Sequence, residues 1–376
     1  MKIKLLFTLL STLCLASSGV QAATIDLTGV GYVTYGDANS YSLAIANYYT
    51  CGAEKGPNCK YTVDGSPGKI DQFVKIVEGA NGHQSNGTAN MDDAFEAVNN
   101  VLYFTMTGSN EPAAGSFAAG GDQVGAWDAT LGALNTKLDL IHNDMTFFFV
   151  NNEPNSQDGL TQSLAVWARI TLTNLAGTTT FGTWDLTNDT RTAAQRLAGT
   201  PTAPGYGPPP IGGGVPMGDV SLYTSEVNAP EKTDFVMSGG QVCIDKTSKT
   251  IVDCTTAASG TFDAINHNLG ENQAPYAVVV PELDAMIRGL INTSSNLDQY
   301  AMHVDVRYGC APPFTITGNG GNASCSDYGT LVSQDNNFEQ IFIGTREATQ
   351  QVPEPETLAL LGLGLFGMGL ARRRKH

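Results

Sequence analysis

Most of the chain between residues 29 and 345 consists of short apolar or alternating segments separated by Gly, Asn, Asp and Pro, a pattern typical of β-strands. The clearest signal is a hairpin. Apolar residues alternate with mostly polar ones over 164–172, Asn174–Gly177 turns the chain, and 179–186 returns. Further strands are predicted at 29–35, 41–49, 69–78, 101–107, 145–150, 234–244, 276–280, 300–308 and 338–345.

Helical spacing of apolar residues occurs in three places. It predicts a short helix over 91–98, a second helix over 131–141 with Asp128 as its N-cap, and a third over 283–291 behind Pro281. Few helices and many strands favour a mainly β body, folded as a sandwich or in a jelly-roll-like manner with two or three short helices.

One stretch breaks this pattern. Residues 201–218 contain six prolines and six glycines, which predicts an irregular segment. It is either a boundary between two subdomains or a long surface excursion.

The first 22 residues have the features of a secretory signal peptide. Lys2 and Lys4 precede an apolar run over 5–16, and Val20 and Ala22 occupy the small-residue positions before a cleavage site. We expect signal peptidase to cut after Ala22, so that residues 23–351 form an exported body.

The last 25 residues, 352–376, have three parts in a fixed order. Val352, Pro353, Glu354 and Pro355 form an extended tetrapeptide, because proline disfavours helix at the residue before it. An uncharged run follows and predicts a membrane-spanning helix over 357–371, about 22 Å long against a hydrocarbon core of about 30 Å. Four cations complete the span and anchor that end on the cytoplasmic side: Arg372, Arg373, Arg374 and Lys375.

This tail resembles the PEP-CTERM sorting signal, the substrate tag of the exosortase system in exopolysaccharide-producing Gram-negative bacteria. The resemblance rests on Val352–Pro355, the Leu/Gly-rich run and the Arg cluster. It implies transient anchoring in the inner membrane, processing near Pro-Glu-Pro by an exosortase-like membrane enzyme, and delivery to the cell surface or extracellular matrix. It implies nothing about the activity of the body.

Export determines how the cysteines are interpreted. An even number of body cysteines in an oxidising compartment predicts disulfides, and short loops close most readily. The predicted pairs are Cys51 with Cys59, Cys243 with Cys254, and Cys310 with Cys325.

The body is acidic. Without the leader and tail, 14 basic and 34 acidic residues remain, a net charge of about −20. This balance argues against nucleic acid as a partner, because nucleic acid requires cationic patches. Charged residues make up only 15% of the whole chain and hydrophobic residues 41%, so the body is globular and not disordered.

Catalytic motifs are missing from the sequence. His83, His142, His267 and His303 are widely spaced and form no metal-ligand pattern, so each is interpreted as a surface or hydrogen-bonded strand residue. Carboxylate pairs such as Asp92 and Asp93 occur without evidence that they converge. No cofactor is predicted, although the oxygen-rich segment 151–159 would suit Ca²⁺.

These observations favour an exported, non-catalytic surface or matrix protein embedded in exopolysaccharide. The first alternative is a carbohydrate-binding or adhesion module that uses exposed aromatic residues, with Trp127, Trp167 and Trp184 as candidates. The second alternative is a secreted hydrolase with a carboxylate pair.

Overall fold

The computed structural model describes residues 24–35, 37–56, 58–65, 72–79, 84–97, 103–106, 117, 121–150, 166–186, 241–248, 251–252, 258–270, 273–309, 316–317, 324–325 and 339–347. The predicted leader (1–22), the Pro/Gly-rich segment (201–218), the sorting tail (352–376) and its membrane span (357–371) lie outside these residues. Within the described ranges, no helix combines the length and the apolar character needed to cross a membrane.

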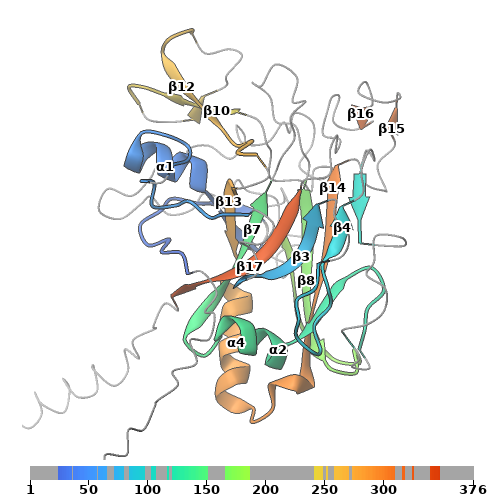
Figure 1. The fold of residues 1–376 in the computed structure, drawn as a ribbon. Helices are drawn as coiled ribbons and strands as arrows, with labels where there is room; N and C mark the ends of the chain where they lie inside the picture. The colour runs from blue at the N-terminus through green and yellow to red at the C-terminus, as the bar shows by residue number, and fades with distance from the viewer. Residues whose placement is uncertain are drawn as a thin grey trace, which may run out of the picture.

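Two large sheets dominate the molecule (Figure 1). The seven-stranded sheet contains, in spatial order, β1 (Val33–Tyr35), β2 (Ala38–Ser42), β13 (Tyr276–Val279), β7 (Asn143–Val150), β17 (Gln340–Glu347), β3 (Val74–Gly79) and β4 (Phe95–Ala97). The five-stranded sheet contains β5 (Tyr103–Thr105), β14 (Tyr300–Gly309), β8 (Val166–Asn174) and β9 (Thr180–Leu186), with β6 (Trp127–Thr130) also paired to β14.

Two small sheets and three α-helices complete the described fold. The small sheets are β11 (Ile251–Val252), β10 (Gln241–Asp245) and β12 (Phe262–Asn266), and the pair β15 (Ile316–Thr317) and β16 (Ser324–Cys325). The helices are α1 (Leu43–Cys51), α2 (Leu131–Leu138) and α4 (Pro281–Thr293), and a 3₁₀ turn, η6 (Leu297–Gln299), precedes β14. The prediction of a mainly β body with few helices is confirmed.

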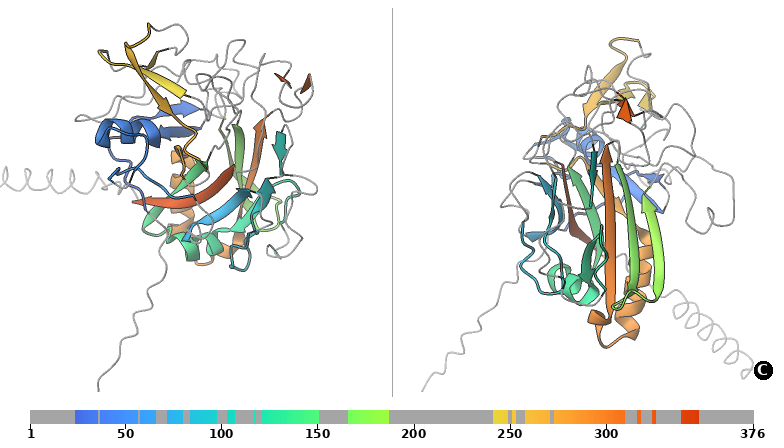
Figure 2. Two further views of the ribbon diagram at one scale, coloured as in Figure 1. Left: turned by 45° about the horizontal axis from the view of Figure 1, so that its top comes forward. Right: turned by 90° about the vertical axis from the view of Figure 1, so that its right-hand side faces the viewer.

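The two large sheets face each other across an apolar core, as the edge-on view in Figure 2 shows. β7 is buried along its whole length, and β17 is buried from Gln340 to Thr345. The hairpin of β8 and β9 has the predicted turn, closed by a hydrogen bond from Gly177 N–H to Asn174 O. Its alternation holds as well, since Val166, Ala168, Ile170 and Leu172 are buried while Arg169 is exposed.

The predicted strand at 41–49 is wrong, because α1 begins at Leu43. The Ser42 side chain accepts a hydrogen bond from Ile45 N–H, and Gly52 ends the helix in the left-handed conformation. The residues from Leu43 to Ala46 are all buried. A continuous apolar run is equally compatible with a buried helix and with a buried strand, so periodicity alone could not distinguish the two.

The predicted helix at 91–98 is also wrong. Met91 forms an isolated bridge with Ala129, and Phe95–Ala97 forms β4, parallel to β3. Asp92 N–H donates to Asp128 O, and Asn86 N–H donates to the Asp93 carboxylate. These contacts tie the backbone to other segments, which local spacing does not reveal.

The predicted N-cap of the second helix lies two residues too early. Thr130 caps α2 by accepting from Ala133 N–H, whereas Asp128 belongs to β6. The helix ends at Leu138, with Asp139 in the left-handed conformation, so Ile141 lies outside it and is 57% exposed.

The rings around β17 make a glycine necessary at position 344. A Cβ atom there would lie 2.8 Å from ring carbons of both Phe73 and Phe148. These two rings pack with Phe342 in one aromatic cluster.

We predict that Gly344→Ala lowers the free energy of unfolding by about 1–3 kcal/mol, because the new methyl group overpacks this cluster. Gly289→Ala is the matched control. It lies inside α4 with no atom within 4 Å of the new Cβ, so it is expected to stabilise the protein by about 0.5–1 kcal/mol. Urea unfolding of both variants measures the difference, and equal effects would contradict the packing argument.

Candidate functional site

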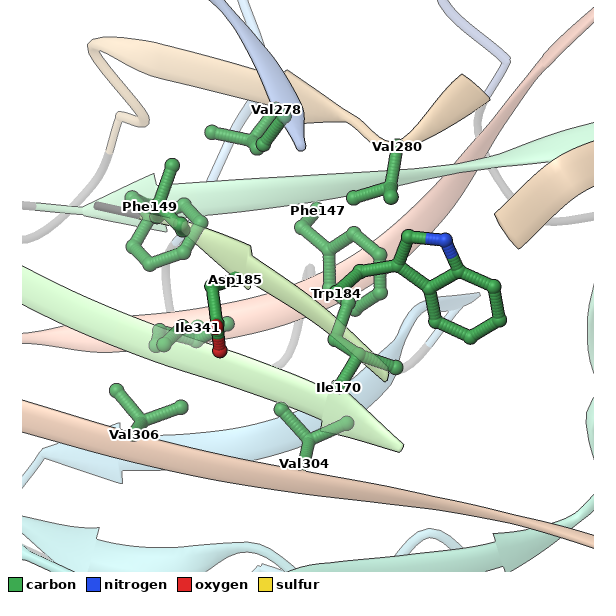
Figure 3. A pocket seen from close by; sticks show the side chains of 13 residues that line it. Phe147, Phe149, Ile170, Trp184, Asp185, Val278, Val280, Val304, Val306 and Ile341 are labelled. Atoms are coloured by element: carbon green, nitrogen blue, oxygen red, sulfur yellow. The ribbon is translucent and has the colours of Figure 1, made fainter. Parts of the chain in front are cut away.

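A pocket between the two large sheets is apolar on both walls (Figure 3). Phe147, Phe149 and Ile341 line it from the seven-stranded sheet, and Ile170 and Val304 line it from the five-stranded sheet. Apart from Asp185 and the Trp184 indole, the lining side chains offer no group that could activate or orient a polar substrate.

The polar residue at this pocket, Asp185, is already engaged. Its carboxylate accepts from Arg169 Nε at 2.6 Å and from Nη2 at 3.2 Å. Asp37 bonds the edge of β9 at the same point: its N–H donates to Asp185 O, and its carboxylate accepts from Asp185 N–H, both at 2.9 Å. The contact joins the β1–β2 turn of one sheet to β9 of the other, so Asp185 has a structural role.

A buried Asp-His-Thr chain lies on the outward side of the five-stranded sheet. His303 Nδ1 lies 2.7 Å from Asp128 Oδ1, and Nε2 lies 2.8 Å from Thr173 Oγ1. The order of groups matches that of a nucleophile, a base and an orienting acid. All three side chains are at most 2% exposed, so a substrate cannot reach the Thr173 hydroxyl in this conformation.

Two more carboxylates adjoin this chain, and Asp92, Asp122 and Asp128 bring carboxylate oxygens within 4.8 Å of one another. Burial, together with the negative charges of Asp128 and Asp122, raises the pKa of Asp92 to about 7. Burial also raises the pKa of Asp128 to about 6, although its hydrogen bond to His303 opposes the rise.

The acidic cluster is a poor fit for Ca²⁺, which takes six to eight oxygen ligands. Asp128 accepts from His303 and from Gln123 N–H, while Asp92 accepts from the backbone of Asp128 and of Phe117. Four contacts from N–H groups therefore already occupy the two inner carboxylates. The predicted Ca²⁺ segment, 151–159, lies outside the described residues.

The remaining candidate residues are separated from one another. His142 is exposed and bonds Asp139, whereas His267 is buried against Ser42 Oγ at 2.7 Å, and His83 is not among the described residues. Asp92 and Asp93 bond different neighbours, so they do not form the converging pair that a glycosidase needs.

The aromatic residues proposed for sugar binding are largely inside the protein. Trp127 is 0% exposed and Trp184 is 5% exposed, so neither offers a stacking surface to a sugar. The side chain of Trp167 is outside the described part. The carbohydrate-binding hypothesis therefore loses two of its three candidates.

Cys51 and Cys59 form the predicted disulfide. Cys243 is buried and also disulfide-bonded. Cys254 and Cys310 lie outside the described residues, and the pairings of Cys243 with Cys254 and of Cys310 with Cys325 stay predictions.

A second charged cluster lies where β7, β17 and α4 meet. Arg346 contacts Asp144 at 3.0 Å and Asp284 at 2.8 Å, and Arg288 contacts the other oxygen of Asp144. Both carboxylates are nearly buried, whereas the Arg346 and Arg288 side chains are 16% and 32% exposed. Burial, with a smaller contribution from the charge of Asp144, raises the pKa of Asp284 to about 7 against the opposing effect of Arg346.

The fold defines a mainly β protein with two facing sheets. Residues 24–307 match the family described as a domain of unknown function (DUF8239), and residues 351–375 match the PEP-CTERM protein-sorting motif. The chain therefore belongs to the DUF8239 family, and its tail is a PEP-CTERM sorting motif. Comparison with curated proteins and with solved structures found no match.

The Asp128–His303 contact was not predicted from the sequence. His303 lies between Ala301 and Asp305 on one face of β14, and a histidine at such a position is only a weak local sign of a buried polar contact. Its partner lies 175 residues away on β6, and only the pairing of β6 with β14 reveals it.

We predict that Asp128→Ala lowers the free energy of unfolding by about 3–5 kcal/mol, because it removes a buried acceptor from both His303 and Gln123 N–H. Asp122→Ala, at the exposed end of the same cluster, is the control and is expected to stay within about 0.5 kcal/mol of wild type. Urea unfolding followed by tryptophan fluorescence tests both, and a mild effect of Asp128→Ala would contradict a structural role.

The raised pKa of Asp284 predicts a pH dependence of stability. Since the folded pKa is about 7 and the ordinary value is 3.8, the folded state binds the additional proton between these pH values. The stabilisation of the folded state by protonated Asp284 is thus fully present below about pH 4 and is lost as the pH rises through about 7.

We expect wild type to lose up to about 4 kcal/mol more stability than Asp284→Asn between pH 4 and pH 8. Glu282→Gln, on the same turn of α4 but exposed, should follow the wild-type curve. Urea titrations across this range measure the slopes. Parallel curves for wild type and Asp284→Asn would refute the assignment.

Proposed function

We propose that the protein is an exported, non-catalytic component of the cell surface or extracellular matrix, processed through its C-terminal tail. The observation that carries this proposal is the sorting motif at residues 351–375. Its Pro-Glu-Pro element, apolar run and cation cluster stand in the order that anchoring followed by cleavage requires.

The tail supplies the expected partner, an exosortase-like membrane enzyme that acts near Val352–Pro355. Export would also require signal peptidase at the predicted site after Ala22. The disulfide between Cys51 and Cys59 is consistent with folding in an oxidising compartment outside the cytoplasm.

The described body supports a structural role. His303 and His267 are buried and hydrogen-bonded, the Asp92–Asp128 carboxylates accept backbone N–H groups, and the intersheet pocket is apolar. None of these three arrangements presents a reactive group to solvent. Retention among exopolysaccharide chains requires no reactive group, which fits the absence of one at these three arrangements of described residues.

The test is expression of the full chain in an exopolysaccharide-producing host that carries an exosortase. We expect wild type to lose its tail and to appear outside the inner membrane. Glu354→Ala should remain uncut in the inner-membrane fraction. Glu356→Ala, just outside the tetrapeptide, should be processed like wild type.

Mass spectrometry of the C-terminus together with cell fractionation distinguishes the outcomes. Normal trimming of Glu354→Ala would contradict recognition through this motif. For wild type, an intact chain with reduced cysteines in the cytosol would refute export. Release of the processed body by polysaccharide-degrading enzymes would support matrix retention, and its complete loss in a low-salt buffer wash before any enzyme is added would contradict it.

A further inference from the structure

The two ends of the folded body meet at one point. Ile25 N–H donates to Thr345 O at 2.9 Å, and the hydroxyls of Thr24 and Thr345 lie 3.0 Å apart. One residue separates Thr24 from the predicted leader, and only four residues separate Glu347, the end of β17, from Val352. The first described residues of the body and the end of β17 therefore lie next to each other.

This exit point is held by strand pairing and by ion pairs. Along β17, residues 340–347 pair with β7, and Ile341–Ile343 pair with β3 on the other side. Arg346, one residue before the end of the strand, is held by Asp144 of β7 and Asp284 of α4. The tail is therefore attached to the end of an interior strand, and this strand end is bonded to α4 through Arg346 and Asp284.

The tether is short compared with the body. Ten residues separate Glu347 from Leu358, where the apolar run begins, and the eleven Cα–Cα steps between the two span only about 37 Å even when fully extended. A compact body of about 330 residues has a radius of gyration of about 20 Å and hence a diameter of about 50 Å. A path around its surface to the opposite end would be roughly 80 Å, so the tail cannot reach there.

From the exit point and the tether length, we infer that the exit corner faces the lipid bilayer while the protein is anchored. The exit corner consists of Thr24, Ile25, Thr345 and Glu347 and the first turn of α4, which Asp284 joins to Arg346. The sheet of β10, β11 and β12 lies away from α4 in Figure 1 and so points away from the membrane. This inference rests on the proposed anchoring by the tail.

The acidic body cannot produce this orientation by adhesion. Glu347 and Glu282 are exposed at the corner, and the net charge of the body is about −20, so an anionic bilayer repels it. The orientation follows from the attachment point and the tether length.

The experiment uses the full chain in vesicles of phosphatidylethanolamine and phosphatidylglycerol, with an energy acceptor on the lipid head groups. One donor dye is placed at Glu282→Cys, on the exit corner, and the other at Thr247→Cys, on the exposed turn after β10. The wild-type chain, treated with the same dye, gives the background. We expect energy transfer from position 282 to be several-fold more efficient than from position 247.

Equal transfer from the two positions, or stronger transfer from position 247, would overturn the inference. Insertion of about 40 Gly/Ser residues between Glu347 and Val352 adds roughly 35 Å of root-mean-square reach and should remove the difference. A difference that survives the insertion would show that the tether does not set the orientation.

Failure of the underlying anchoring gives a separate result. A full chain that does not sediment with the vesicles would refute the tail as an anchor and the orientation with it. A chain that sediments but shows no difference between the two dyes refutes the orientation alone, and the proposed sorting function stands.

Discussion

The pairing of β17 between β7 and β3 is the constraint on which the described fold depends. The strand comes from the C-terminal end of the body but occupies the interior of the seven-stranded sheet, with Gln340–Thr345 buried. Its partner β7 lies about 200 residues earlier in the chain. Contacts of such large sequence separation form only after a considerable loss of chain entropy, so the sheet closes late in folding. For an exported protein, closure must wait until residue 347 has crossed the membrane.

Polar contacts then fasten the layers around the apolar core. Asp37 ties the β1–β2 turn to β9, His303 ties β14 to Asp128 of β6, and Arg346 ties β17 to α4. Each contact is made between segments distant in sequence. A buried charge without its partner costs several kcal/mol, so these contacts select one arrangement of the sheets over alternatives that the apolar residues alone would permit. The burial that makes these polar contacts important for the fold also keeps their side chains from reacting with solutes.

The sequence predicts what local physics determines. The β8–β9 hairpin followed from alternation and from the turn over Asn174–Gly177, and α4 followed from helical spacing behind Pro281. The 41–49 and 91–98 segments failed because their apolar residues fit more than one period, and the outcome was decided by Ser42, Asn86 and Asp128 through contacts that spacing cannot show. The sorting tail was recognised because its signal is contiguous. The Asp128–His303 chain and the Arg346 cluster could not be, since each joins residues brought together only by strand pairing.

The charge of the body limits how it can be retained outside the cell. With about 20 excess negative charges, it repels anionic lipid and acidic polysaccharide alike. Once the tail has been removed, the cation cluster at Arg372–Lys375 is lost with it, and no comparable basic run occurs between residues 23 and 351. Retention in a matrix must therefore come from uncharged polar contacts, from entanglement, or from divalent cations shared with the polymer. Of these, only cation sharing is abolished by chelation, and only uncharged contacts are insensitive to both chelation and polymer length. The effects of chelation and of polymer length on release therefore distinguish the three modes of retention before the polymer is identified.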